Sequence, residues 1–152
     1  MRLTQLFLPQ TVVTGIPASS KEALLAAIVR DLDEKGFIAD RAVATNDVIA
    51  RETVMSTGVG NGVAIPHAYT DGVQRLVAGL YRTDAGVSFG APDDLDVSLF
   101  FVILGPRASR REHIRVLARI SRLLGNADFR DELRRAEDAG AVIGVLRRFG
   151  ER

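Results

Sequence analysis

Apolar residues recur every three or four positions along several stretches of this chain, between charged and polar residues. This spacing places apolar side chains on one helical face, and together with polar capping residues it predicts amphipathic helices. The predicted helices cover about residues 19–36, 46–55, 109–124, 126–134 and 139–148. The expected capping residues are Ser19 with Glu22, Thr45, Ser109 with Glu112, and Asn126. The expected stripe after residue 109 is Ile114, Leu117, Ser121 and Leu124, with Val116 and Ile120 alongside.

Short apolar runs between these helices predict β-strands at residues 63–66, 76–81, 87–89 and 97–104. Residues 97–104 are apolar at every position except Ser98, which is typical of a strand buried on both faces. Helices before, between and after the strands predict an α/β fold, with a mixed β-sheet flanked by α-helices on both faces. We expect a single layered domain over residues 1–152, because this length suits one domain.

Composition and charge exclude several classes of function. Hydrophobic residues make up 47% of the 152 residues and charged residues 26%, which are values of a folded globular protein. Twenty basic and 19 acidic residues leave a net charge of +1, so the sequence gives no global reason to expect nucleic-acid binding. Cysteine is absent, which removes thiolate chemistry and disulfides. No apolar run reaches the length of a membrane span or signal peptide, so we expect no membrane insertion and a cytoplasmic location.

The two histidines of the chain lie at positions where α/β folds bind ligands. His67 follows the glycine-rich loop at residues 56–62, at the end of a predicted strand, and His113 lies in the first turn of a predicted helix. Histidine can act as a nucleophile near neutral pH, and a helix N-terminus favours its neutral form. Arg51 precedes the loop and suits phosphate binding. These parts describe a phosphoryl site.

The predicted phosphate-binding loop consists of Ser56, Thr57, Gly58, Gly60 and Gly62. Its glycines let the backbone turn so that N–H groups face an anion. Because the molecule that accepts the phosphoryl group must approach closely, we expect His67 to lie in a shallow apolar depression.

Each residue also has a structural interpretation. His67 alone is equally well a hydrogen-bonded strand-end histidine, His113 a surface helix residue and Arg51 a solvated charge. The glycines alone mark a turn. A metal site is disfavoured, because no acidic residue has ligand-like spacing to either histidine. Arg110 and Arg111 are either a solvated face or a docking point for an acidic partner beside His113.

Residues 51–67 read RETVMSTGVGNGVAIPH, a string that closely resembles the active-site signature of one group of enzyme IIA domains. These are the IIA domains of the fructose/mannitol class in the phosphoenolpyruvate-dependent sugar phosphotransferase system, which include the nitrogen-regulatory members. The resemblance extends to SKEALLAAIVRDLDEKGFI at residues 20–38, to GVSFGAPDDLDVSLFFVILGP at residues 86–106 and to REHIRVLARISRLL at residues 111–124.

This resemblance implies a phosphotransferase component with a mixed sheet flanked by helices. It implies that His67 is the phosphorylated residue, taking its phosphoryl group from HPr, and that Arg51 and His113 are auxiliary. The resemblance also implies that the phosphorylated protein acts next on an enzyme IIB or on a regulated target protein. It implies no cofactor. Residues 99–124, LFFVILGPRASRREHIRVLARISRLL, resemble the nitrogen-regulatory members more. A free-standing sugar-uptake IIA and a non-catalytic binding module of the same fold are the alternatives. A histidine-dependent hydrolase is less favoured, because no suitable acid or metal accompanies the pair.

Overall fold

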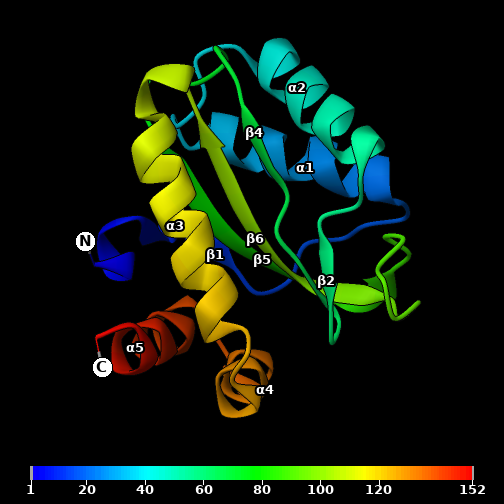
Figure 1. Cartoon of the computed structure of the whole chain (residues 1–152), viewed down its shortest axis with the longest axis vertical. Helices are drawn as coiled ribbons and strands as arrows, with labels where there is room; N and C mark the ends of the chain where they lie inside the picture. Colours follow the sequence, from blue (N-terminus) through cyan, green and yellow to red (C-terminus); the bar gives the residue numbers. More distant parts are fainter. Residues whose placement is uncertain (1, 152) are drawn as a thin grey trace.

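A six-stranded mixed β-sheet runs between two layers of α-helices (Figure 1). The computed structural model describes residues 2–151. The strands are β1 (Phe7–Val13), β2 (Gly58–Gly60), β3 (Val63–Ala64), β4 (His67–Tyr69), β5 (Val77–Val87) and β6 (Val97–Gly105). The helices are α1 (Lys21–Glu34), α2 (Arg41–Val54), α3 (Arg110–Leu123), α4 (Ala127–Arg135) and α5 (Ala139–Gly150), with 3₁₀ turns η1 (Leu3–Gln5) and η2 (Arg107–Ser109).

The strand order is β1-β5-β6-β3-β2, and β4 also pairs with β6. β5 and β6 are antiparallel, whereas β1 runs parallel to β5, and β3 and β4 run parallel to β6. α1 and α2 cover one face of the sheet, and α3, α4 and α5 cover the other (Figure 1). The predicted α/β fold with helices on both faces is therefore confirmed.

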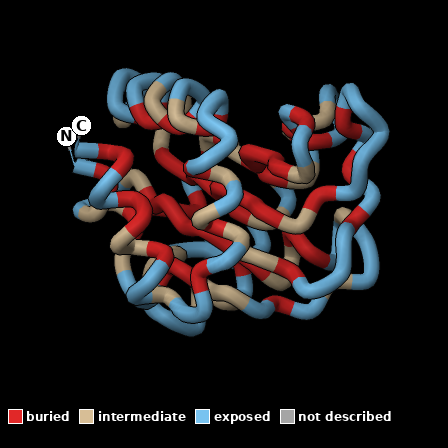
Figure 2. The backbone as a smooth tube through the Cα atoms, turned by 90° about the horizontal axis from the view of Figure 1, so that it is seen from below, coloured by how far each residue is buried: buried red, intermediate tan, exposed pale blue. Residues whose placement is uncertain are grey.

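The central strand β6 divides the core into two clusters by the alternation of its side chains. Leu99, Phe101 and Ile103 pack toward α3, α4 and α5, and the intervening residues Phe100, Val102 and Leu104 pack toward α1 and α2. All six are 0–1% exposed, as expected for a strand that is apolar at successive positions. Buried residues accordingly follow the strands through the middle of the molecule, and exposed ones lie along its outside (Figure 2).

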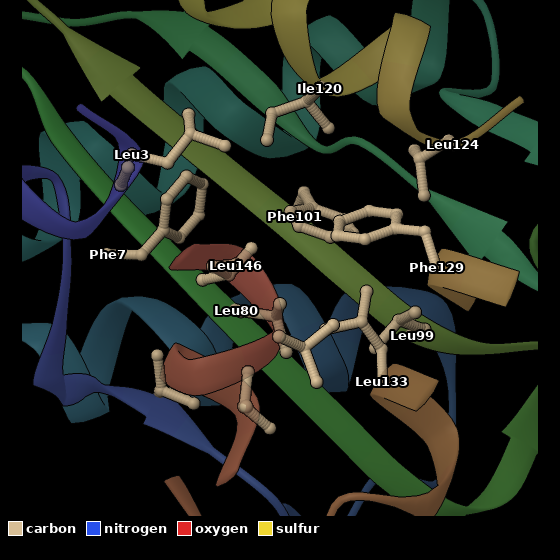
Figure 3. Close-up of a cluster of buried hydrophobic side chains, with 14 of the residues drawn as sticks. Leu3, Phe7, Leu80, Leu99, Phe101, Ile120, Leu124, Phe129, Leu133 and Leu146 are labelled. Atoms are coloured by element: carbon tan, nitrogen blue, oxygen red, sulfur yellow. The ribbon is translucent and has the colours of Figure 1, made fainter. Parts of the chain in front are cut away.

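One of these clusters fills the space between the sheet, α3, α4 and α5 (Figure 3). The Phe101 ring lies 5.8 Å from the Phe7 ring and 6.4 Å from the Phe129 ring, centroid to centroid. These contacts join β6, β1 and α4, three segments that are distant in the sequence. They fix the sheet that carries the site.

The helix starts differ from several predictions. α2 begins at Arg41, because Asp40 Oδ1 accepts a hydrogen bond from the Val43 N–H, so Thr45 lies inside the helix. The cap of α1 is Ser20 instead of Ser19. Ser109 precedes α3 but makes no side-chain cap bond, because η2 leads directly into the helix. The predicted Asn126 cap is confirmed by its bond from the Asp128 N–H.

The strand predictions need several corrections, and they do not include β2 or β4 at all. β5 is one long strand, Val77–Val87, which takes in most of the run at 76–81 but only Val87 of the run at 87–89, and its register shifts between Arg82 and Val87. The run at residues 63–66 is a strand only at Val63–Ala64. β1 was not predicted, because Pro9 and Gln10 interrupt its apolar pattern and the register shifts beside them. None of the helices within residues 2–151 is long and apolar enough to cross a lipid bilayer.

The buried stripe of α3 also differs from the prediction. Its buried residues are His113, Val116 and Ile120, whereas Ile114 is 50% exposed. The helix is therefore rotated so that a histidine points into the protein and an isoleucine points out. This rotation decides the position of the second histidine.

Candidate functional site

The backbone before and after His67 pairs with one strand, β6. β3 pairs with β6 at Leu99 and Phe100, and after Pro66 the chain returns to the same neighbour as β4, where His67 lies opposite Ile103. Across the gap, the Ile103 N–H donates to the Pro66 carbonyl at 3.0 Å. The histidine thus stands at a strand start, on a fixed backbone.

The His67 ring has its orientation and its tautomer set by one hydrogen bond. Nδ1 lies 2.7 Å from the Ile65 carbonyl oxygen. A carbonyl can only accept, so Nδ1 carries the hydrogen and Nε2 keeps its lone pair. Burial lowers the pKa of His67, and the Arg51 charge lowers it further, against opposing effects of the Ile65 carbonyl and of Glu52. The ring is therefore neutral at pH 7, with Nε2 available as a nucleophile.

His67 opens into a shallow depression of about 240 Å³. Its lining residues are Arg51, Ser56, Thr57, Gly58, Val59, Ile65, His67, Leu117 and Ser121. Five of the predicted site residues are among them, although they come from α2, the glycine-rich loop and β4. The other two predicted glycines, Gly60 and Gly62, do not line the depression. The depression is large enough for a phosphoryl group and open enough for another protein to reach it.

Arg51 reaches the depression from the last turn of α2. One of its guanidinium nitrogens, Nη1, donates to the Met55 carbonyl at 3.0 Å. A guanidinium has five N–H groups, so donors remain for an anion beside His67. The same bond satisfies a carbonyl at the end of α2 and holds the side chain against the chain that leads into the loop.

His113 lies next to His67, inside the protein. The two ring centroids are 5.8 Å apart, and the Tyr69 ring lies 4.5 Å from that of His113. The His113 side chain is 1% exposed, so its interpretation as a surface helix residue is wrong. Burial, with a smaller effect of the His67 charge, lowers its pKa to about 4. Neither ring nitrogen has a hydrogen-bond partner among the described residues.

The amides of the glycine-rich loop are bonded within the protein. The Thr57 N–H donates to Glu52 Oε1 at 2.7 Å, and the Gly58 N–H donates to Ser56 Oγ at 3.0 Å. The Ser56 hydroxyl in turn donates to the Phe89 carbonyl at 2.6 Å. The expected arrangement, in which loop amides face an anion, is therefore corrected for Thr57 and Gly58. Their bonds shape the floor of the depression instead.

The three glycines of the loop have two different structural roles. Gly60 and Gly62 have positive φ values of 90° and 75° and form the turn between β2 and β3, around Asn61. Gly58 is needed for space, because a Cβ there would lie 2.8 Å from the Ala91 Cβ. Only Gly58 adjoins His67 through the depression.

The sequence analysis missed the residues that hold this loop from below. Glu52, which is 3% exposed, accepts the Thr57 hydroxyl at 2.6 Å as well as its N–H. Lys21 at the start of α1 places its ammonium 2.9 Å from the Glu52 carboxylate. A signal existed, because Glu52 follows the buried Val48 by four residues and shares its helix face. Nothing comparable indicated Lys21, which is 31 positions away.

Within residues 2–151, no cluster of three histidine, aspartate or glutamate side chains is arranged to hold a metal ion. The side chains that face His67 are instead a guanidinium, hydroxyls and apolar groups. Such groups can bind and stabilise a phosphoryl group without a metal.

Known proteins resemble this chain over nearly its whole length. Residues 5–148 match the family described as "Phosphoenolpyruvate-dependent sugar phosphotransferase system, EIIA 2". A nitrogen regulatory protein of Pseudomonas aeruginosa is 37% identical over 146 residues, covering 96% of this chain and 95% of that protein. The fructose-specific EIIA component of Haloferax volcanii is 35% identical, covering 86% of this chain and 84% of that protein.

Solved structures agree in fold. The nitrogen regulatory protein IIA-Ntr of Neisseria meningitidis superposes with a TM-score of 0.86 at 30% identity, covering 95% of this chain and 98% of that one. The mannitol IIA enzyme of Escherichia coli, in its complex with phosphorylated mannitol IIB, gives a TM-score of 0.77 at 20% identity, over 92% of this chain and 96% of that one.

Proposed function

Because this chain belongs to the EIIA 2 family of the phosphoenolpyruvate-dependent sugar phosphotransferase system, we propose that it carries a phosphoryl group on Nε2 of His67. The observation that supports this assignment is the bond from Nδ1 of His67 to the Ile65 carbonyl. It leaves Nε2 unprotonated on a ring that burial keeps neutral at pH 7. No deprotonation is then needed before the attack.

The transfer step needs positioning and charge stabilisation more than acid–base chemistry. The Nε2 lone pair forms a bond to the phosphorus of a donor phosphohistidine, the donor's P–N bond breaks, and the leaving imidazole keeps the electron pair. The positive charge that develops on the His67 ring is stabilised at Nδ1–H by the Ile65 carbonyl. The same carbonyl supports the reverse step, so the phosphoryl group can be passed on.

Two neighbours assist the transfer in this proposal. The Arg51 guanidinium, which lines the depression with His67, stabilises negative charge on the phosphoryl oxygens. His113 is neutral at pH 7, because its pKa is about 4, so one of its ring nitrogens is an N–H donor. The His113 ring lies beside that of His67 and its nitrogens have no hydrogen-bond partner among the described residues, so it can donate to the phosphoryl group without competing bonds.

The proposed donor is an HPr-type carrier, and the proposed acceptor is an enzyme IIB or a regulated target protein. Members of this family work with phosphocarriers and IIB partners, as the mannitol IIA–IIB complex illustrates. The similarity to nitrogen regulatory proteins over 95% or more of this chain favours the nitrogen-regulatory role. A free-standing sugar-uptake IIA is the alternative, supported by the fructose-specific relative.

Intact-mass measurement tests the proposal. The protein is mixed with phosphoenolpyruvate, enzyme I and an HPr that is competent with another IIA domain. We expect one acid-labile phosphoryl group, absent in His67→Ala, and a ¹⁵N shift pattern that places it on Nε2. His113→Ala should still accept the group, more slowly. Normal acceptance by His67→Ala would overturn the assignment, and no transfer at all would favour a non-catalytic binding module.

A further inference from the structure

We propose that α3 presents an arginine face that docks the acidic surface of the protein exchanging phosphoryl groups with His67. This proposal rests on the phosphocarrier function proposed above and adds the chemistry of the partner. The arginine face is defined as the exposed arginines of η2 and α3, namely Arg107, Arg110, Arg111, Arg115 and Arg122.

The charge of the molecule is concentrated on this segment. Residues 107–122 contain six arginines and one glutamate, a net charge of +5, although the whole chain has a net charge of +1. The rest of the chain therefore carries a net charge of −4. Such a separation produces a positive field over one helix, which the overall composition conceals.

No carboxylate within residues 2–151 lies within 4 Å of any guanidinium of the arginine face, whereas three arginines elsewhere in the molecule have such a partner. Arg41, Arg134 and Arg148 all have such partners. Within α3, Arg111 and Arg115 also stand four residues apart, a spacing at which like charges destabilise a helix slightly. Because no carboxylate of the described residues neutralises these charges, they are available to a partner.

The arginine face begins at the rim of the site. Leu117 and Ser121 of α3 line the depression, and Ile114 and Arg110 continue the same helical stripe toward the start of α3. At that end, the Arg107 guanidinium lies 5.8 Å from the centre of the Tyr69 ring, which packs on His113. A protein that reaches His67 over the start of α3 therefore passes Arg107 and Arg110. In this proposal its contact continues across the exposed side of the helix to Arg111 and Arg115.

Apolar residues beside the arginine face favour a protein over a nucleic acid as the partner. Ile114 is 50% exposed on α3, and Val59 and Met55, which are 49% and 70% exposed, lie on the loop and at the end of α2. Protein interfaces combine an apolar centre with a charged rim. With the rim positive on the α3 side, the complementary partner carries carboxylates there, which would speed and orient docking.

Charge reversal tests the proposal. The variant Arg111→Glu/Arg115→Glu is compared with the control Arg30→Glu/Arg75→Glu, which makes the same charge change at exposed positions on α1 and on the loop before β5. The measured quantity is kcat/KM for transfer from the phosphorylated HPr-type carrier of the same organism. At ionic strength of about 0.02 M we expect the α3 variant to lose roughly tenfold or more, and the control less than twofold. The difference should shrink at about 0.5 M, where surface charges are screened.

The outcomes separate this proposal from the function on which it rests. At saturating donor, both variants should still reach one phosphoryl group per chain, and both should melt at the temperature of the unchanged protein. If the unchanged protein never becomes phosphorylated, the phosphocarrier function itself fails. Equal rates and equal salt dependence for the two variants would overturn the docking proposal. The docking proposal would also be overturned if the α3 variant transferred phosphoryl groups at the normal rate but lost binding to a fluorescent DNA duplex.

Discussion

The Glu52 carboxylate accepts both the backbone N–H and the hydroxyl of Thr57, at 2.7 and 2.6 Å. One side chain of α2 thereby fixes the position and the rotamer of the residue that follows Ser56 in the lining of the depression. The Lys21 ammonium, 2.9 Å from the same carboxylate, balances its charge in a buried setting. The loop next to His67 is therefore tied to both helices of one layer.

Removing the Glu52 carboxylate should loosen this loop. Glu52→Ala leaves the Thr57 N–H and the Thr57 hydroxyl without their acceptor, and leaves the Lys21 ammonium with only the Phe89 carbonyl. We expect the free energy of unfolding to fall by about 2–4 kcal/mol. Phosphoryl transfer to His67 should slow as well, because the depression loses its shape. Urea denaturation and transfer kinetics check the two effects.

The exposed Glu34→Ala, on α1, is the matched control for Glu52→Ala, and its effect should stay within about 0.5 kcal/mol. Equal destabilisation by the two substitutions would contradict the structural role of Glu52. Glu52→Gln keeps one acceptor oxygen and should fall between them.

Protonation of His113 should lower the free energy of unfolding in mild acid. The unfolded chain binds this proton near pH 6.5, but the folded protein resists it until about pH 4, because the ring is buried. The unfolded state thus binds more protons in this window, and stability falls as the pH drops through it. As a result of this one titration, the free energy of unfolding should be roughly 3 kcal/mol higher above pH 6.5 than below pH 4.

His113→Leu isolates that contribution. We expect its unfolding free energy to depend less on pH between 6.5 and 4 than that of the unchanged protein. At pH 7 the variant should be as stable or more stable by about 1 kcal/mol, since it removes two buried nitrogens without partners. Its phosphoryl transfer should nevertheless be slower. Parallel pH profiles of the two proteins would contradict the buried, neutral state of this ring.

The spacing around Gly58 predicts opposite effects for two alanine substitutions. In Gly58→Ala the new Cβ would meet Ala91 at 2.8 Å, so the loop must move, and we expect a loss of about 1–3 kcal/mol with slower transfer. Gly144 lies within α5 with nothing within 4 Å of an added Cβ. Gly144→Ala should therefore stabilise the protein by about 0.5–1 kcal/mol without affecting transfer. Thermal unfolding of both variants decides the point.

The sequence predicted those parts of the fold that have a strong local pattern. β6 is apolar at successive positions and α1 has clear periodicity, so both were found within about two residues of their ends. β1 has no such pattern, because Pro9 and Gln10 interrupt it and its place depends on pairing with β5, some 70 residues away. Local signals cannot encode a pairing of that kind.

For the site, the sequence indicated the residue types but not their surroundings. The positions of His67 and Arg51 followed from the motif, and the structure brings them to one depression. The burial of His113 did not follow, because the rotation of α3 is set by packing of Val116 and Ile120 against the sheet. The expected role of the loop amides failed because Glu52, on a different element, accepts the Thr57 N–H and the Ser56 hydroxyl accepts that of Gly58.

The anchoring of His67 bears on how any regulatory message leaves this protein. Its backbone belongs to β4, and its ring is tied to the Ile65 carbonyl two residues earlier. We therefore expect a phosphoryl group added at Nε2 to alter the charge of one small area and to leave the backbone beneath it in place. A partner protein that binds a remote surface would then meet the same structure in both forms. A protein that distinguishes the two forms must contact the phosphate directly, and so competes with the phosphoryl donor for the same surface.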